Sequence, residues 1–346
     1  MFHTKSDIRD RLIDVGVSDA NAVLLAQQAK PAVWLETSTV KNEAEIAIGA
    51  TKLGGLPDLP AGVAWPMRPI YPDAEARTKF IRADAADPDR AWRWATPEQR
   101  EEFRQDTLTR IQKIESAQPL SFIAQINLAE MWAAGSLDPD IPRQGVLSIF
   151  YDFAGEPSGF DPQDRVGFAI LFHDAGALTR SVEPGELRND FYARYRLSPL
   201  ACGAHACMTP LPHVEAEYER MGLPEEVMNM LDGWWDEDDF LYSSQEDEDW
   251  KCHRIGGWPT PVQDGMQTQC ALVHAGHHCG AGESYKDPVL ASIRATATDW
   301  LLLAQIGADE KGNMNWGDNG QIYVWIRRDD LKARRFENAW LILQSY

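Results

Sequence analysis

The chain has 346 residues, 44% hydrophobic and 25% charged, which is the composition of a folded globular protein rather than a disordered one. Its formal net charge of −20 argues against nucleic acids and anionic membranes as partners, because binding phosphate groups normally requires a basic face. No apolar run reaches the roughly 18 residues of a membrane span, and the first residues, MFHTKSDIRDRL, are charged, so we expect a cytoplasmic protein.

The first 30 residues predict a helical hairpin. Ser6 and Ser18 are each placed to cap a helix that carries apolar residues at helical spacing, and Gly16 separates the two helices. A DNA-reading helix-turn-helix is the alternative interpretation, but the acidic chain argues against it.

Residues 73–118 are rich in charge and predict a helical insertion. Thr96-Pro97-Glu98-Gln99 marks a helix start, with proline at the first helical position and a glutamine placed for a capping box. The segment before it, residues 54–66, is dense in Pro and Gly and predicts an ordered loop.

Short apolar runs of strand length favour a largely antiparallel sheet. Strands are expected at residues 32–36, 44–48, 120–126, 146–153, 166–173 and 192–200, and helices at 213–221 and 224–231.

Three sequence blocks recur in the same order. GGLP at Gly54 returns as GGWP at Gly256, FIAQI at Phe122 returns as LLAQI at Leu302, and GVLSIFY at Gly145 is echoed by GQIYVWI at Gly320. The order favours an internal duplication whose first half is lengthened by the insertion. We therefore predict an α+β fold of mainly antiparallel sheets, in which two degenerate repeats form one pseudo-symmetric unit. The predicted organisation is a hairpin at 1–30 and a duplicated domain at 31–346, with halves at about 31–180 and 190–346.

At these blocks the chain resembles the YwqG-like proteins, a bacterial family named as a domain of unknown function. The matching stretches include GGLPDLPAGVAWP, LSFIAQINLAE, HRIGGWPTPVQDGM, DWLLLAQIGAD and NWGDNGQIYVWIRRDDL, from about Gly49 to the C-terminus. The resemblance implies a single α+β fold and no established activity. The insertion at 73–118 and the segment 232–250 look like departures from the family pattern.

Residues 232–250, DGWWDEDDFLYSSQEDEDW, interleave nine carboxylates with six large apolar side chains, five of them aromatic. Such a mixture resembles the anchors of protein interfaces, although a surface helix whose aromatic face packs on its own core explains it equally well. The candidate partner-binding residues are Trp234, Trp235, Asp236, Glu237, Asp238, Asp239 and Trp250.

Polar residues in and near the repeats define a candidate cleft. Gln125 and Gln305 lie inside apolar strands and need buried hydrogen-bond partners, so they either line a cleft or tie strands together. Gln263, Asp309 and Asp318 complete the candidate set. The carboxylates and amides of residues 309–318 could also approach a hard cation, but an Asx-rich turn between strands is the preferred interpretation.

The best metal candidates are Cys270, His274, His277, His278 and Cys279. Zinc accepts such ligands, but their spacing matches no zinc pattern, so we favour no cofactor and expect reduced cysteines. No catalytic motif is present, which leaves enzymatic activity open and inclines us against it.

The leading functional hypothesis is a non-enzymatic protein-binding module, namely an immunity protein that neutralises a basic toxin such as a nuclease. Its basis is the acidic balance and the segment 232–250. The alternative is a small-molecule-binding protein or enzyme that uses a cleft between the two halves. The sequence does not define the oligomeric state.

Overall fold

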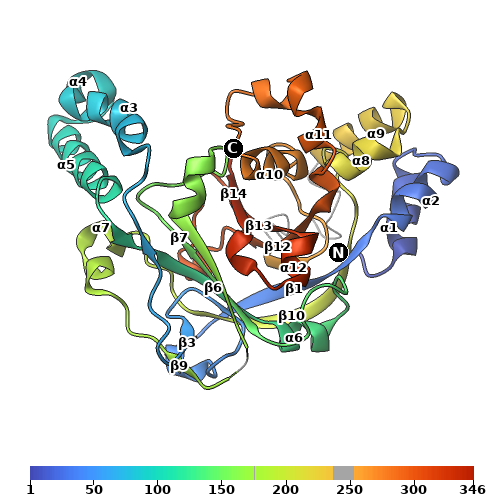
Figure 1. The fold of residues 1–346 in the computed structure, drawn as a ribbon, viewed down its shortest axis with the longest axis horizontal. Helices are drawn as coiled ribbons and strands as arrows, with labels where there is room; N and C mark the ends of the chain where they lie inside the picture. The colour runs from blue at the N-terminus through green and yellow to red at the C-terminus, as the bar shows by residue number, and fades with distance from the viewer. Residues whose placement is uncertain (175, 237–252) are drawn as a thin grey trace.

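Ten strands form one curved antiparallel sheet at the centre of the molecule (Figure 1). A computed structural model describes residues 1–174, 176–236 and 253–346, without the side chains of residues 233–236. The strand order is β14-β13-β12-β11-β1-β10-β2-β6-β7-β8. The bounds are β1 Lys30–Thr39, β2 Lys52–Leu53, β6 Ser121–Asn127, β7 Val146–Tyr151, β8 Phe168–His173, β10 Leu200–Thr209, β11 His253–Gly256, β12 Trp300–Gly307, β13 Gln321–Arg327 and β14 Trp340–Gln344.

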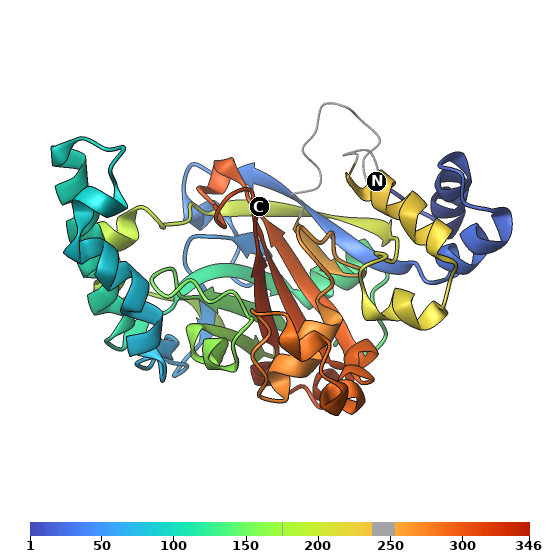
Figure 2. The ribbon, with the colours of Figure 1, turned by 90° about the horizontal axis from the view of Figure 1, so that it is seen from above.

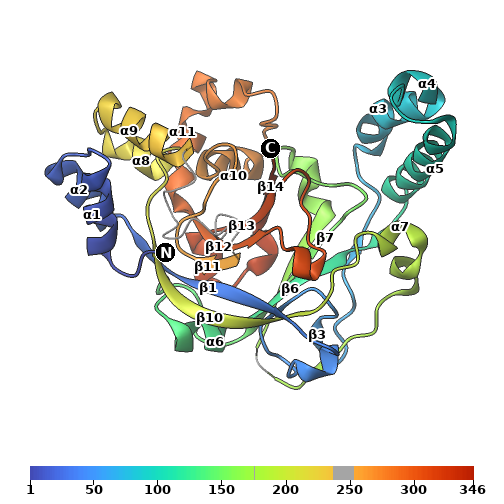
Figure 3. The same ribbon diagram turned by 180° about the vertical axis from the view of Figure 1, so that it is seen from behind.

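The long strands β1 and β10 join the two sides of the sheet (Figure 3). They pair along their whole length, from Lys30 opposite Thr209 to Thr39 opposite Leu200. β11 pairs with the other edge of β1, and β2 pairs with the other edge of β10. Neither side is therefore a sheet of its own.

The two edges of the sheet approach each other. Phe168 of β8 meets Trp340 of β14 with ring centroids 5.3 Å apart, and Phe172 stacks on Phe336 at 4.6 Å. The sheet nearly closes, and the apolar core inside it draws residues from both sides, such as Ile123 and Leu303.

The predicted insertion is helical and projects from one end of the molecule (Figures 1 and 2). It contains α3 (Ala74–Ala86), α4 (Pro88–Ala91) and α5 (Pro97–Ile114), and it leaves the body through a ribbon of β4 (Met67–Arg68) and β5 (Gln118–Pro119). Thr96 and Gln99 form the expected capping box.

The N-terminal hairpin lies at the opposite end (Figure 2), with α1 (Lys5–Asp14) and α2 (Asp19–Gln27) packed near α8 (Ala216–Met221) and α9 (Glu225–Asp236). Ser18 caps α2 as predicted. The prediction that Ser6 caps α1 is wrong: Thr4 caps it, because Thr4 and Asp7 satisfy each other's backbone N–H groups.

Two predicted strands are wrong. Residues 44–48 hold a 3-10 turn, η1 (Glu43–Glu45), because the Asn42 side chain accepts from the Ala44 N–H and starts a turn. Residues 192–200 begin in α7 (Asp190–Ala193), capped by Asn189, and the strand starts only at Leu200. In both cases an asparagine cap outweighs the local apolar pattern.

Short helices and turns fill the connections. The remaining elements are β3 Asp58–Pro60, paired with β9 Leu178–Arg180; α6 Leu128–Ala134, α10 Gln267–His274, α11 Ala291–Arg294 and α12 Arg328–Lys332; and 3-10 turns at Pro162–Gly167, Gly185–Arg188, Glu283–Tyr285, Pro288–Leu290, Ala297–Asp299, Glu310–Gly312 and Phe336–Asn338. In the ranges that the structure covers, no helix combines the length and apolarity that spanning a membrane requires.

Gln125 on β6 and Gln305 on β12 occupy matching places on the two sides of the sheet. Both side chains are buried. Gln125 accepts a hydrogen bond from the backbone N–H of Asp58, and Gln305 accepts one from the backbone N–H of Thr260, both at 2.8 Å. Each of these donors directly follows a Gly-Gly-x-Pro block. In the strand register, Gln125 lies opposite the buried Lys52, and Gln305 lies opposite the buried Arg254. The predicted duplication is consistent with these bonds but remains a prediction.

We expect these amides to contribute measurably to stability. Gln125→Ala leaves the buried N–H of Asp58 without its acceptor, so the free energy of unfolding should fall by about 1–3 kcal/mol. Gln305→Ala should act similarly through Thr260. Denaturant titration measures both, and Gln112→Ala, at an exposed position of α5, is the control that should stay within about 0.5 kcal/mol of wild type. Losses no larger than the control's would mean that these bonds are dispensable.

Candidate functional site

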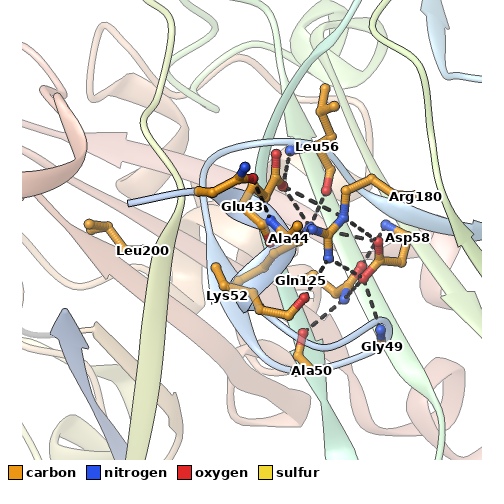
Figure 4. Close-up of polar contacts among 12 residues, drawn as sticks. Glu43, Ala44, Gly49, Ala50, Lys52, Leu56, Asp58, Gln125, Arg180 and Leu200 are labelled. Carbon is orange, nitrogen blue, oxygen red and sulfur yellow. Dashed lines mark hydrogen bonds and ion pairs between the residues drawn. The ribbon is translucent and has the colours of Figure 1, made fainter. Parts of the chain in front are cut away.

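A buried charge cluster lies beside Gln125 (Figure 4). The fully buried carboxylate of Asp58 accepts hydrogen bonds from Arg180 Nε at 2.8 Å and from the Gly49 N–H at 2.8 Å, and it lies 3.7 Å from Lys52 Nζ. Burial alone would raise the pKa of Asp58, but the bonds from Arg180, Gln125 and Gly49 together hold it below its usual value.

Glu43 balances the charge of this cluster. Its Oε1 lies 2.9 Å from Lys52 Nζ and accepts from the Leu56 N–H at 2.7 Å, and Lys52 Nζ also donates to the Leu56 carbonyl. Two carboxylates thus face two cations, Lys52 and Arg180, and each charged group has a partner. The cluster fixes the loop between β1 and β3, and we assign it a structural role.

A cleft of about 510 Å³ opens between the two sides of the sheet. Four segments contribute to it: the end of β7 with the residues after it, the segment before β10, the β12–β13 connection and the end of β14. Its lining consists of Tyr151, Phe153, Glu156, Arg194, Tyr195, Leu197, Asn313, Asn315, Trp316, Gly317, Leu343 and Ser345.

Stacked aromatic rings form one wall of the cleft. Phe153 lies between Tyr195, at 5.1 Å and 15°, and Trp316, at 5.7 Å and 3°. Tyr151 meets Trp316 edge to face at 6.2 Å. Trp316 is held by a hydrogen bond from its Nε1 to the Gly307 carbonyl at 2.9 Å. The wall is therefore held together by contacts within the protein.

Charged residues at the rim are already paired with each other. Arg194 binds Asp106 of α5 in a bidentate pair, with N–O distances of 2.7 and 2.8 Å. Glu156 binds Arg110, also of α5. The helical insertion therefore supplies a counter-charge to each side of the cleft, and the rim has no net charge from these four groups.

Both sides of the sheet hold the segment 194–198 in place. From the first side, the Gly55 N–H donates to the Leu197 carbonyl at 3.1 Å. From the second, Asn313 Nδ2 donates to the carbonyls of Arg194 and Arg196 at 3.2 and 3.1 Å. Contacts from both sides of the sheet therefore position this part of the cleft lining.

Two non-glycine residues of the lining have left-handed backbone conformations, Glu156 at φ 45° and Asn313 at φ 55°. Asparagine tolerates this conformation, whereas glutamate adopts it rarely. Only the conformation of Glu156 is therefore strained, and such strain concentrates at ligand sites.

The five polar residues predicted for a cleft are not among its lining. Gln125 and Gln305 are buried among strands and hydrogen-bond to loops. Gln263 and Asp318 are exposed, and Gln263 Nε2 donates to the carbonyl of Ser345, which does line the cleft. Asp309 begins the β12–β13 connection outside it.

Asp309 instead ties this connection to β1. Its carboxylate accepts from Thr37 Oγ1 at 2.6 Å and lies 3.4 Å from His253 Nε2. Burial opposes the charge, but the hydrogen bonds of His253 and Thr37 lower the pKa of Asp309 to about 2. The contacts within residues 309–314 confirm the turn between strands.

The side chains of the predicted partner-binding residues lie outside the part of the chain that the structure describes. Trp234, Trp235 and Asp236 end α9 but their side chains are not described, and Glu237, Asp238, Asp239 and Trp250 lie outside the described residues.

The predicted metal candidates do not converge. Cys270 and Cys279 are buried free thiols, and burial raises the pKa of both. His274 and His278 are exposed, and His277 is half-buried. Throughout residues 1–174, 176–236 and 253–346, no three His, Cys, Asp or Glu side chains are grouped so that they could hold a metal ion.

The sequence carries a signal for the cleft in its Trp-Gly-Asp-x-Gly element. Trp316 and Gly317 belong to the Trp-Gly-Asp-x-Gly element, and Asn313 and Asn315 belong to the Asx-rich turn that the sequence predicts within residues 309–318. Tyr195 lies in residues 192–200, for which the sequence predicts a strand, so its place before β10 follows only from the structure.

A protein-family model matches residues 51–345, and its description is a domain of unknown function (DUF1963). The narrower YwqG-like name remains a prediction. A search of curated proteins finds no match.

The structural role of the buried charge cluster predicts a pH dependence. Asp58→Asn removes a buried charge that Lys52 and Arg180 need, so we expect a loss of about 3–5 kcal/mol in the free energy of unfolding near neutral pH. The folded-state pKa of Asp58 is lowered, so its contribution is present above the ordinary value of 3.8 and is lost as the pH falls through the folded-state pKa.

The difference between wild type and Asp58→Asn should therefore shrink below about pH 4. Chemical unfolding at several pH values measures it, with Asp329→Asn, at an exposed position, as the matched control. A difference that stays constant down to pH 2 would contradict this account.

Proposed function

We propose a function from the residues of this chain itself, because the chain belongs to a family whose description, a domain of unknown function, names no activity. The proposal is that the cleft binds one small, uncharged molecule that combines a ring with several polar groups. It concerns binding and includes no chemical step.

The observation that carries the proposal is a preformed cleft at one end of the nearly closed sheet. Its volume of about 510 Å³ falls within the range of small-molecule sites, which is about 300–1,000 Å³. The mouths of closed sheets and the junctions between structural halves are common places for such sites.

The chemistry of the lining supports a ring-containing ligand. Phe153, Tyr195 and Leu197 offer apolar contact for a ring. Asn315 and Ser345 offer an amide and a hydroxyl group for polar substituents, whereas the Asn313 Nδ2 is already bonded to backbone carbonyls. Nucleosides and simple glycosides have this combination of features.

The paired charges at the rim support an uncharged ligand. Arg194 is occupied by Asp106, and Glu156 is occupied by Arg110. A phosphate or carboxylate group of a ligand would have to displace the carboxylate that already binds Arg194 or Arg110, or else lie close to that carboxylate. The formal charge of −20 adds a general disadvantage for anions.

The hypothesis of a basic protein partner, such as a toxin bound by an immunity protein, remains a separate proposal supported by the acidic balance. The side chains of its candidate anchors lie outside the described part of the chain, whereas the residues that line the cleft lie within it. We likewise retain the internal duplication, the YwqG-like name and a cytoplasmic location as proposals.

Calorimetric titration with adenosine, uridine and methyl β-glucoside tests the binding proposal. We expect at least one of them to bind to the wild-type protein. Tyr195→Ala removes part of the aromatic wall and should weaken that binding about tenfold, equivalent to about 1.4 kcal/mol. Asn315→Ala, which changes an exposed lining residue, should also weaken it.

Trp94→Ala is the control, because Trp94 is exposed on the insertion and does not belong to the lining. It should bind as wild type does. Binding of none of the three compounds, or equal effects of Tyr195→Ala and Trp94→Ala, would contradict the proposal.

The preference for uncharged ligands has its own test. Asp106→Asn frees Arg194, so affinity for the monophosphate of the best-binding nucleoside should rise at least tenfold and fall with added salt. Glu101→Gln is the matched control, because it frees Arg104 on the same helix without changing the lining. An equal gain in the control would show a general charge effect instead.

A further inference from the structure

Tyr195 brings an open hydroxyl group to the cleft. Its side chain is half-buried, and its hydroxyl makes no hydrogen bond to the residues that the structure describes. The oxygen is also not among the buried polar atoms that lack a partner, so it is accessible from outside the protein. The other phenol of the lining differs in both respects, because the Tyr151 hydroxyl is buried and donates to the Pro157 carbonyl at 3.1 Å.

Ring contacts hold the Tyr195 side chain in the wall of the cleft. One face stacks on Phe153, which in turn stacks on Trp316, and both of these residues line the cleft. Phe191 also contacts the Tyr195 ring, with centroids 5.5 Å apart. These contacts involve the ring and not the hydroxyl, so the ring keeps its supports when the hydroxyl is removed.

The charged groups that act on the Tyr195 hydroxyl are those of the two rim ion pairs, Glu156 with Arg110 and Arg194 with Asp106. Glu156 and Arg194 belong to the lining, which places the hydroxyl at the rim of the cleft. Burial raises the pKa of Tyr195, the two carboxylates add to this effect, and the two arginines oppose it. Because the pKa is raised overall, the hydroxyl stays protonated at neutral pH and can donate a hydrogen bond.

The surroundings favour an uncharged acceptor for this donor. Arg194 and Arg110 are already bound to carboxylates, so neither is available to neutralise an anion beside the hydroxyl. A neutral carbonyl, ring nitrogen or hydroxyl can accept from Tyr195 without displacing either pair. An anionic acceptor would lie near the carboxylates of Glu156 and Asp106.

We propose that the Tyr195 hydroxyl donates a hydrogen bond to an uncharged acceptor of the cleft ligand and thereby discriminates between related ligands. The acceptor is a carbonyl oxygen, a ring nitrogen or a hydroxyl oxygen. This inference rests on the proposed function and gives Tyr195 a polar role in addition to its place in the aromatic wall. A compound of the same shape that lacks the acceptor gains nothing from the hydroxyl.

Tyr195→Phe tests the inference, because it removes the hydroxyl and keeps the stacked ring. The variant should unfold at the same temperature as wild type, since the hydroxyl bonds to no described residue. Tyr192→Phe is the matched control: its hydroxyl also lacks a partner within the described chain, but it is buried and Tyr192 does not line the cleft. The probes are adenosine, uridine and methyl β-glucoside, together with deaza and deoxy analogues that each lack one acceptor of the parent compound.

For a parent compound that binds wild type, we expect Tyr195→Phe to weaken binding about fivefold, as the loss of one neutral hydrogen bond does, and Tyr192→Phe to leave it unchanged. The analogue that lacks the acceptor of Tyr195 should bind wild type and Tyr195→Phe equally. Unchanged binding of the parent by Tyr195→Phe, or an equal loss for the parent and every analogue, would overturn the inference and leave the proposed function intact. Failure of wild type to bind any of the three parent compounds would overturn the proposed function itself.

Discussion

The absence of a side chain at Gly54 is the constraint on which the arrangement of this protein depends. A β-carbon there would lie 2.4 Å from the Ser198 carbonyl oxygen, and its φ of 64° is one that glycine adopts without strain. The close approach lets the loop after β2 contact the segment before β10. That segment carries Tyr195 and Leu197, which line the cleft, so the cleft depends on this contact.

Two sets of buried polar groups stabilise the fold. Asp58, Lys52, Arg180 and Glu43 form a paired cluster that holds one loop, and Gln125 and Gln305 bind loop N–H groups on opposite sides of the sheet. Leaving any of these groups unpaired in the core would cost more than the pair itself contributes. They are best understood as supports for the fold.

The cleft differs from these supports because it leaves the Asn315 side chain on an open surface. The aromatic wall ends at a space large enough for a ligand. The insertion contributes to the site without entering it, since Asp106 and Arg110 of α5 neutralise Arg194 and Glu156. A segment that looks like an addition to the fold therefore determines the charge of the site.

Local sequence signals were sufficient wherever the determining interaction is local. The apolar runs of β6, β7 and β12, the caps of α2 and α5 and the helical nature of residues 73–118 follow from neighbouring residues, and the structure has them. The same reasoning failed at residues 44–48 and 192–200, where asparagine caps impose turns on apolar patterns. Burial of Gln125 and Gln305 was foreseeable because an amide in an apolar strand needs partners, but the choice of those partners was not. Only the tertiary structure brings Phe153, Tyr195 and Trp316 into one stack, because their contact depends on the curvature and near closure of a ten-stranded sheet, which no short stretch of sequence encodes.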